Sequence, residues 1–334
     1  AEVTLAMYRG EYNNGEYSEG GYLYYMSDES ILGNGNIEDI CLGYDSLKEY
    51  EKDPYYMGAV VGRVANRISN AEYFDGPFLV KLTKNATPHH LHGGTMALNK
   101  VVWDAKPIKK KNSVGVELTF CSPSGDNGYP GTVNFKLSYL LTNTNKFLIY
   151  FQAETDKRTP INLTSHIYFN LSAGKCINVL DHYLMINALK HLDTSPDLIP
   201  SGKANYVHGS AANFSRGKVI GEEIEKTNGG YDHTFVINKE PGKFAITAKV
   251  IEPLSGRIIE IITDQPSLQF YTANSFDGKQ VGKNEKVFVK HAGLCLETQG
   301  FPDAPNQAGF PSVFINPGEK YSHHTQINFE LNKD

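Results

Sequence analysis

The chain has 334 residues, of which 37 are acidic and 32 basic, so its net charge near neutrality is −5. This charge offers no basic footprint for nucleic acid, and no apolar stretch reaches the roughly 20 residues that a membrane-spanning helix needs. The frequent Gly, Tyr and Phe residues are typical of a protein rich in sheets and turns. No linker or internal repeat divides the sequence, and all-β folds of this length often form one unit. We therefore expect residues 1–334 to form a single domain.

Little of the chain has a helical pattern. Residues 1–36 are polar and rich in Tyr and Gly, and they give no clear pattern, although we expect them to belong to the same domain. Residues 46–51 are the only segment typical of a capped helical turn. The short basic run at residues 109–111 is more typical of a solvated strand edge than of a nucleic-acid site.

Alternating apolar and polar residues predict short strands along most of the chain. The expected strands cover residues 114–120, 133–139, 147–151, 245–252, 257–263, 268–272, 286–297 and 325–331. The segment Pro253-Leu254-Ser255-Gly256 joins two of them as a hairpin, and residues 122–131 form a loop rich in Gly, Pro and Ser. Many short strands separated by turns favour an all-β fold, a β-sandwich or a related architecture.

The cysteines indicate the compartment. Cys41, Cys121, Cys176 and Cys295 are widely spaced and form neither a Cys-x-x-Cys pair nor a zinc pattern. We expect them to be buried free thiols in a reducing compartment, which favours a cytoplasmic location. The first residues do not resemble a signal peptide, although a chain that starts at Ala could have lost a leader.

Two clusters in the first third of the chain combine ligand-binding residue types. Residues 62–67 hold two arginines and Asn66 among small residues, and taken alone Arg63 and Arg67 favour a solvated strand or helix edge. The second cluster, residues 89–94, places three histidines before a Gly pair. Two of them, His90 and His92, fit either metal ligands on one strand face or hydrogen-bonded histidines near a turn, and the second interpretation is favoured.

Three further residues are candidates for proton transfer or binding. His166 lies among strand-forming residues, where a histidine is more often structural than catalytic, and Asp232 follows a Gly-Gly turn, where an aspartate usually caps or forms an Asx-turn. Glu297 ends a predicted strand just before a loop, and a carboxylate fixed there is well placed for proton transfer. An ordinary strand-end charge is the alternative for Glu297.

The motifs that are missing narrow the chemistry. The sequence has no Gly-x-Ser-x-Gly elbow, no dinucleotide fingerprint and no phosphate-binding loop. The remaining His, Glu, Asp, Asn and Arg residues suit acid/base chemistry on a polyhydroxylated substrate, because carboxylate, Arg and Asn groups bind vicinal hydroxyls by charge-assisted hydrogen bonds.

Six motifs, in order along the chain, resemble those of the aldose 1-epimerase (galactose mutarotase) family. They are Gly-Arg-Val-Ala-Asn-Arg-Ile, Leu-His-Gly-Gly, Asn-Leu-Thr-Ser-His-x-Tyr-Phe-Asn-Leu, Gly-Tyr-Asp-His, Gln-Phe-Tyr-Thr-Ala-Asn and Leu-Glu-Thr-Gln-x-Phe-Pro-Asp-Ala-Pro-Asn. The likeness runs from about residue 37 to residue 331, and residues 42–45 and Trp103 also fit. Six motifs in register make a specific resemblance.

The resemblance implies a large antiparallel β-sandwich, the galactose mutarotase-like supersandwich, with a sugar in an open cleft. It implies an isomerase that interconverts the anomers of galactose or glucose, with Glu297 as general base and His166 as general acid. A neighbouring carboxylate or hydroxyl is expected to keep His166 protonated near neutrality. Residues Asn66, Arg67, His92, Asp232 and Gln269 would hold sugar hydroxyls. The resemblance implies a monosaccharide as the partner of a monomer or homodimer, with no metal, organic cofactor, nucleic acid or membrane.

Some residues depart from the family pattern. Residues 212–216 read Ala-Asn-Phe-Ser-Arg where the family often has Phe-Asp-Phe, and Ser165 replaces the Asn that commonly precedes the histidine. The N-terminal strands also differ. Since the acid/base pair is intact, these departures concern substrate preference more than activity.

Three rival functions remain open at this point. A hexose-phosphate epimerase would need more cations than Arg63 and Arg67 near the sugar. A non-catalytic carbohydrate-binding protein would not need both Glu297 and His166. A glycosidase would normally need two catalytic carboxylates, for which Asp232 and Glu297 are candidates, although the resemblance gives Asp232 a binding role.

Overall fold

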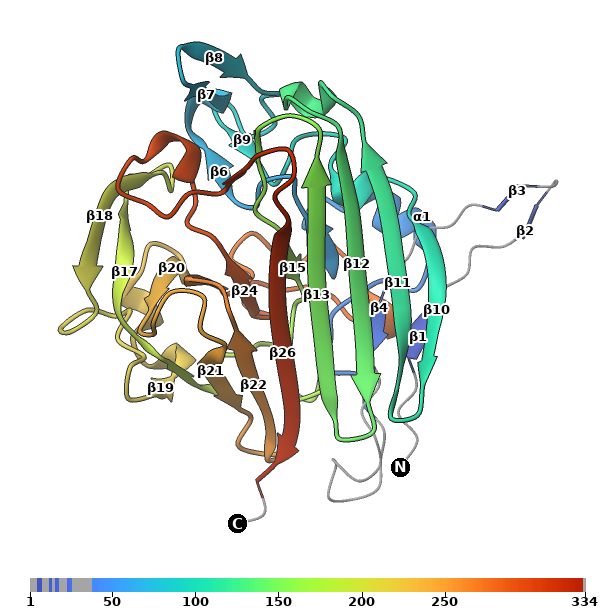
Figure 1. The fold of residues 1–334 in the computed structure, drawn as a ribbon. Coiled ribbons are helices and arrows are strands. Elements are labelled where there is room, and N and C mark those ends of the chain that lie inside the picture. The colour runs from blue at the N-terminus through green and yellow to red at the C-terminus, as the bar shows by residue number, and fades with distance from the viewer. Residues whose placement is uncertain (1–4, 8–11, 14–15, 18–22, 26–37, 333–334) are drawn as a thin grey trace.

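The computed structural model describes residues 5–7, 12–13, 16–17, 23–25 and 38–332 (Figure 1). Most of the N-terminal segment singled out above therefore lies outside the described residues. Within it, β1 (Leu5–Met7) pairs with β4 (Leu23–Tyr25), and β2 (Tyr12–Asn13) pairs with β3 (Glu16–Tyr17).

The larger of the two main sheets has nine strands, and every neighbouring pair in it is antiparallel. In spatial order the strands are β10 (Asp104–Lys110), β11 (Ser113–Ser122), β12 (Val133–Thr142), β13 (Lys146–Thr155), β26 (Tyr321–Leu331), β22 (Arg257–Thr263), β21 (Ala245–Ile251), β16 (Tyr183–Ile186) and β19 (Lys218–Val219). The predicted strands at residues 114–120, 133–139, 147–151, 245–252, 257–263 and 325–331 all lie in this sheet. The basic run begins on its edge strand β10, as expected.

The second sheet has five strands and carries most of the chemistry described below. Its order is β18 (Pro200–Tyr206), β17 (Ala188–Thr194), β20 (Asp232–Ile237), β23 (Ser267–Tyr271) and β24 (Cys295–Gln299). The predicted strand at 286–297 is wrong in extent, since β24 starts only at Cys295. The preceding residues form turns instead: the Ala292 N–H donates to the Val289 carbonyl, and His291 has φ +65°.

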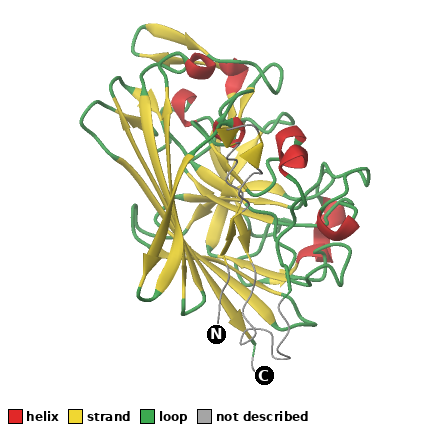
Figure 2. Ribbon diagram, turned by 90° about the vertical axis from the view of Figure 1, so that its right-hand side faces the viewer, coloured by secondary structure: helices red, strands yellow, loops and turns green. Residues whose placement is uncertain are grey.

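Short pairs of strands and helical turns complete the fold. The pairs are β5 (Ala59–Val61) with β15 (Thr164–His166), β6 (Arg67–Ile68) with β9 (His90–Leu91), β7 (Glu72–Asp75) with β8 (Phe78–Lys81), and β14 (Thr159–Pro160) with β25 (Phe314–Ile315). The 3₁₀ turns cover Ser69–Ala71, Leu98–Lys100, Asp126–Gly128, Ile220–Lys226, Lys283–Glu285 and Ala304–Asn306. The predicted helical turn is confirmed as α1 (Leu47–Lys52), where the Ser46 N–H donates to the Glu49 carboxylate at 2.9 Å. Figure 2 shows the helices and many of the loops on the side away from the large sheet.

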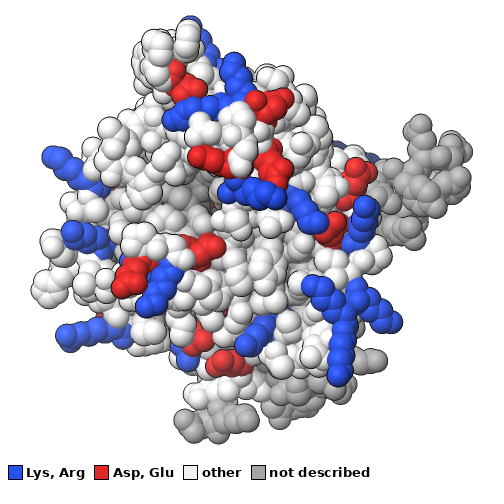
Figure 3. Space-filling view, viewed as in Figure 1, with Lys and Arg blue, Asp and Glu red and all other residues white. Residues whose placement is uncertain are grey.

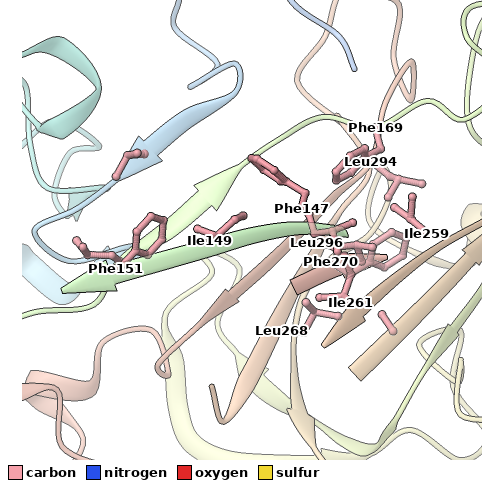
Figure 4. Close-up of a cluster of buried hydrophobic side chains, with 14 of the residues drawn as sticks. Phe147, Ile149, Phe151, Phe169, Ile259, Ile261, Leu268, Phe270, Leu294 and Leu296 are labelled. Carbon is pink, nitrogen blue, oxygen red and sulfur yellow. The ribbon is translucent and has the colours of Figure 1, made fainter. Parts of the chain in front are cut away.

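The main core lies between the two sheets. On β12, Phe135, Leu137 and Tyr139 point inward while Lys136 between them is exposed, which is the alternation expected of a half-buried strand. Figure 4 shows Phe147, Ile149, Phe151, Ile259 and Ile261 of the large sheet in one cluster with Leu268, Phe270 and Leu296 of the smaller sheet. Burial of each such side chain contributes about 1.5–3 kcal/mol, so this interface holds the smaller sheet in place.

The cysteines and surface charges were only partly predicted. All four thiols are free, but Cys295 alone is buried, whereas Cys41 and Cys176 are half-buried and Cys121 is exposed on β11. The expectation of four buried thiols is therefore wrong for Cys121, whose side chain alternates outward. Acidic and basic side chains are interspersed over much of the face in Figure 3. None of the helices in the described part of the chain is both long and apolar enough to cross a bilayer.

Candidate active site

One large cavity, of about 1010 Å³, opens beside the five-stranded sheet. All seven candidate residues line it: Asn66, Arg67, His92, His166, Asp232, Gln269 and Glu297. They come from six strands or strand ends that are far apart in the sequence, so the fold assembles them. Tyr56, Tyr168 and Tyr271 form part of its wall.

A row of polar side chains crosses three neighbouring strands at the base of the cavity. In the antiparallel register Thr234 faces Gln269, and Gln269 faces Glu297, so the three side chains project from the same face of the sheet. The Thr234 hydroxyl donates to Oε1 of Gln269, which leaves the Gln269 amide nitrogen to donate to Oδ1 of Asp232. The row thus fixes the orientation of the Gln269 amide.

Glu297 and His166 meet at the end of this row. Oε1 of Glu297 lies 3.6 Å from Nε2 of His166, and the two residues are only 2 % and 5 % exposed. The second carboxylate oxygen, Oε2, is buried and has no hydrogen-bond partner among the described residues. His166 is held from behind, because β15 pairs with β5 and the Gly58 N–H donates to the His166 carbonyl at 3.0 Å.

Burial shifts the titration of this pair in opposite directions. It raises the pKa of the Glu297 carboxyl well above its usual range, with repulsion from Asp232 as the second cause. It lowers the pKa of His166 to about 4. The expectation that a neighbour keeps His166 protonated is therefore wrong for the free protein, since desolvation disfavours the imidazolium. A neutral pair and an ion pair contain the same number of protons, so moving one proton interconverts them.

Asn66 and His92 lie in adjoining turns and are joined by two hydrogen bonds, one of them accepted by the His92 ring. The Asn66 N–H donates to Nδ1 of His92 at 3.2 Å, and the His92 N–H donates to the Asn66 carbonyl at 3.0 Å. Both residues have positive φ, +64° and +52°, an uncommon conformation for side chains other than Gly that often marks a functional site. Because Nδ1 accepts a hydrogen bond and burial lowers the pKa of His92 well below its usual value, neutral His92 carries its proton on Nε2.

His90 belongs to the core. It is fully buried (0 % exposed), its Nδ1 lies 2.6 Å from the Thr83 carbonyl, and its Nε2 lies 2.8 Å from the Tyr129 hydroxyl. No group of three or more His, Cys, Asp or Glu side chains suited to a metal occurs in the described part of the chain. The favoured interpretation of His90 as a hydrogen-bonded structural histidine is confirmed.

The two arginines of residues 62–67 have different surroundings. Arg63 is 3 % exposed, and its guanidinium donates to the Ser122 hydroxyl and to the carbonyls of Ser122, Pro123, Pro130 and Gly131. The expectation of a solvated edge is thus wrong for Arg63, which anchors the loop at residues 122–131. Arg67 lines the cavity, and its guanidinium makes no hydrogen bond to another described residue. It lies close enough to Asp232 to oppose the burial that raises the pKa of that carboxyl.

Several residues of the cavity were not anticipated from the sequence. The Tyr56 ring lies 4.6 Å from the His92 ring and 6.1 Å from the His166 ring, and Tyr56 has φ +57°. Buried Asp53 accepts hydrogen bonds from the Tyr55 and Met57 N–H groups, which fixes this turn. Cys295 also lies behind His166. An Asp-Pro-Tyr-Tyr sequence is a turn signal, but nothing local indicates where the turn packs.

The departures from the family pattern lie at the edges of the site. Ala212 lines the cavity while Phe214 is fully buried in the core. Ser165 alternates with His166 along β15 and interacts with the Tyr139 hydroxyl of the large sheet. Its side chain therefore lies away from the acid/base pair.

Comparisons with known proteins identify the family. The model of the family described as aldose 1-epimerase matches residues 29–328. The chain is 39 % identical over 298 residues to galactose mutarotase of Sus scrofa, with 89 % of this chain and 85 % of the relative covered, and 38 % identical to that of Homo sapiens over the same shares. It is 33 % identical over 312 residues to aldose 1-epimerase of Escherichia coli K12, with 91 % and 88 % covered.

Solved structures share the fold. A GalM/aldose epimerase homologue from C. elegans matches with a TM-score of 0.82 at 24 % identity, with 99 % of both chains covered. A galactose 1-epimerase from Lactobacillus acidophilus matches with the same TM-score and identity over 99 % of this chain and 100 % of its own. The antiparallel β-sandwich of the galactose mutarotase type is therefore confirmed. Together with the family model and the curated relatives, it shows that this chain belongs to the aldose 1-epimerase family.

Proposed function

We propose that this chain interconverts the α and β anomers of an aldohexose, galactose or glucose, with Glu297 as the base and His166 as the acid. The relatives named above are mutarotases and aldose 1-epimerases. The observation that carries the assignment of roles is the buried contact between Glu297 and His166 in the wall of the cavity, 3.6 Å between Oε1 and Nε2. The pair is isolated from solvent and offers one acceptor and one donor side by side.

The reaction needs two groups that exchange roles. Glu297 takes the proton of the C1 hydroxyl, the bond from C1 to the ring oxygen breaks, and His166 gives a proton to that oxygen. The open chain rotates about the bond between C1 and C2. The hydroxyl formed from the ring oxygen then attacks the other face of the aldehyde, while His166 removes the proton of this hydroxyl and Glu297 returns a proton to the carbonyl oxygen. No proton is gained or lost over the cycle, and the scheme requires no metal or organic cofactor.

The neutral state of the free pair is compatible with this scheme. Because burial favours a neutral carboxyl and a neutral imidazole, the catalytic ion pair forms when one proton moves from Glu297 to His166. Sugar hydroxyls that enter the cavity replace lost water as hydrogen-bond partners of the carboxylate, in particular of the unpartnered Oε2. Bound substrate thereby favours the ionised base.

The remaining residues are assigned to binding. Asp232 accepts hydrogen bonds from sugar hydroxyls, and Gln269 holds its Oδ1 in place. The unpaired guanidinium of Arg67 donates to hydroxyl oxygens, while His92 donates from Nε2 because its Nδ1 is already paired with Asn66. Asn66 acts through its backbone and its contact with the Arg67 N–H at 2.8 Å. These groups give the sugar one orientation against the acid/base pair.

The rival functions fit the surroundings less well. Arg67 and Lys226 are the cations among the described residues that line the cavity, and Lys226 is paired with Glu223 at 2.8 Å, which leaves little positive charge for a sugar phosphate. A binding protein gains nothing from a buried Glu297–His166 pair. A glycosidase would use Asp232 as a second catalytic carboxylate, but that carboxylate is engaged by the Gln269 amide.

Polarimetry separates these functions. Fresh α-D-glucose and α-D-galactose should reach anomeric equilibrium faster with the protein than without it, while a methyl glycoside control stays unchanged. Release of sugar from the glycoside would instead indicate a glycosidase. Binding without faster mutarotation would indicate a carbohydrate-binding protein, and faster mutarotation of glucose 6-phosphate alone would indicate a hexose-phosphate epimerase.

Two expectations about the protein in the cell belong to the same proposal. We place it in the cytoplasm, where a free-thiol protein of this kind meets its sugar. We also expect a monomer or homodimer, which light scattering coupled to size-exclusion chromatography measures directly.

A further inference from the structure

A buried cysteine that the reaction scheme does not use lies directly behind the proposed acid. Cys295 begins β24, two residues before Glu297, so both side chains project from the same face of the strand. The cysteine is fully buried (0 % exposed), and its Sγ lies 3.5 Å from Nδ1 of His166. One strand therefore contacts both nitrogens of the imidazole, through Cys295 at Nδ1 and through Glu297 at Nε2.

We propose that Cys295 is a positioning residue for the proposed mutarotation: its thiol pairs with Nδ1 of His166 and holds Nε2 toward Glu297 and the bound sugar. This inference rests on the proposed function for its effect on turnover, but the contact itself can be tested without substrate.

The other neighbours of the ring do not replace the thiol. Tyr56, His92, Tyr168 and Tyr271 contact the ring through their aromatic faces or edges, with centroids 4.9–6.3 Å away. No other side chain in the described ranges hydrogen bonds to Nδ1. The carbonyl of His166 itself also interacts with the ring, but it shares its acceptor capacity with the Gly58 N–H at 3.0 Å and belongs to the same residue, so it does not relate the ring to β24. The aromatic contacts restrict the plane of the ring, and the thiol determines which of its two nitrogens faces Glu297.

A thiol suits both protonation states of the acid. Its sulfur accepts a hydrogen bond from Nδ1–H of the imidazolium, and it still does so after Nε2 has released its proton, because the neutral ring then keeps its proton on Nδ1. Burial raises the pKa of Cys295 well above its usual value, so the group stays an uncharged thiol. A carboxylate at this position would stabilise the imidazolium and weaken it as an acid. The neutral, weak partner therefore orients His166 and leaves it able to release its proton to a ring oxygen.

The test combines kinetics with nitrogen NMR of the histidine ring. In Cys295→Val and Cys295→Ala, which lack a hydrogen-bonding group, kcat for mutarotation should fall about tenfold while KM stays within about twofold. The Nδ1 resonance of His166, assigned with the His166→Asn variant, should shift in both. Cys295→Ser keeps a hydroxyl that can donate and accept, and it should retain kcat within about threefold. Cys121→Val, an exposed cysteine of β11, is the matched control and should change neither quantity.

Each result decides the proposal. An unmoved His166 resonance in both apolar variants would overturn it, as would equal losses of kcat in the Ser and Val variants, because packing alone would then explain them. Two apolar variants of different size keep the test valid if one of them fails to fold. If the unmodified protein does not accelerate mutarotation at all, the proposed function fails, while the resonance shift still reports whether Cys295 pairs with His166.

Discussion

On β12 of the large sheet the buried residues include Val133, Phe135 and Leu137, whereas on β23 and β24 of the smaller sheet Gln269 and Glu297 are buried to a similar degree. The first set needs no partners, and its burial stabilises the fold. Gln269 regains hydrogen bonds with Thr234 and Asp232, but Oε2 of Glu297 loses water and gains no partner among the described residues. Burial of an incompletely paired polar group costs about 1–3 kcal/mol. The site is therefore built at the expense of stability that the large sheet supplies.

The backbone is also regular in the large sheet and irregular around the cavity. β11, β12 and β13 each run for ten residues in a regular antiparallel ladder. Around the cavity the elements are short, and Tyr56, Asn66 and His92 all have positive φ. Such conformations persist only where the surrounding structure holds them. Removing a functional group from the site should thus reduce activity with little loss of stability, and removing an apolar group from the large sheet should do the reverse.

The largest expected effect is on turnover, at the acid/base pair. Glu297→Gln keeps the shape but lacks the basic oxygen, and His166→Asn cannot give a proton to the ring oxygen. Each should lower kcat by about 10² to 10⁴, and the double variant should lose less than the product of the two, because each step needs both groups. Polarimetry with stopped mixing measures the rates. Near-normal turnover of either folded variant would refute the assignment.

The reverse effect is expected in the core of the large sheet. Leu137 is fully buried on β12, so Leu137→Ala should lower the free energy of unfolding by about 2–5 kcal/mol with kcat and KM nearly unchanged. The adjacent Lys136→Ala, on the outer face where Lys136 pairs with Glu117, is the control and should change it by less than about 1 kcal/mol. Denaturant titration gives both values. We also propose that the chain is one domain, so a single cooperative transition should shift, and two separate transitions would contradict this.

These two regions were not equally predictable from sequence. The strands of the large sheet follow from a local pattern, because every second residue faces the same core. The same pattern failed at residues 286–294, where Val287 is exposed while Phe288 and Val289 pack in a separate cluster of the core, because the chain turns here. Arg63 was misjudged for a related reason, since the carbonyls that surround it come from residues 59 to 68 positions away.

The candidate site was found by motifs, and its geometry was not. The seven residues that the resemblance singled out line one cavity, and their roles are proposals. Local sequence gave only an ordinary carboxylate at Glu297 and an ordinary histidine at His166. Their contact depends on the pairing of β15 with β5 and on the position of β24 beside it, both of which are tertiary. The same is true of Cys295, whose role in holding the ring cannot be inferred without the 3.5 Å contact.

A smaller effect is expected for the binding residue Asp232. Asp232→Asn keeps an oxygen that can accept from the Gln269 amide but loses the charge that strengthens hydrogen bonds to sugar hydroxyls. Loss of a charged hydrogen bond costs about 1.5–3 kcal/mol, so KM should rise roughly tenfold or more, while kcat should fall less than in the Glu297 and His166 variants. Initial rates over a range of galactose concentrations provide the measurement. Loss of kcat at unchanged KM would make Asp232 a proton carrier instead.

The last prediction concerns stability at low pH, where buried histidines of the two regions should have different effects on the free energy of unfolding. His323 of β26 lies among Thr298, Thr325 and the Leu163 carbonyl, and burial lowers its pKa to about 3. Between pH 6.5 and 4.5 the unfolded chain binds a proton at this histidine and the folded chain does not. The free energy of unfolding should therefore fall on acidification by about 1.4 kcal/mol per pH unit from His323 alone.

In the candidate site, proton uptake by His166 on unfolding and proton release by Glu297 should cancel. His166, with its pKa lowered to about 4, gains a proton on unfolding in the same interval, but Glu297, with its pKa raised well above 4.5, loses one. Unfolding thus changes the proton count of the pair by about zero. The slope of unfolding free energy against pH should drop by one proton in His323→Gln and stay unchanged in the double variant His166→Asn with Glu297→Gln. Denaturant titrations at several pH values between 4.5 and 6.5 measure the slopes. A changed slope in the double variant would mean that the folded pair does not hold one titratable proton throughout this interval, and that Glu297 or His166 titrates within it.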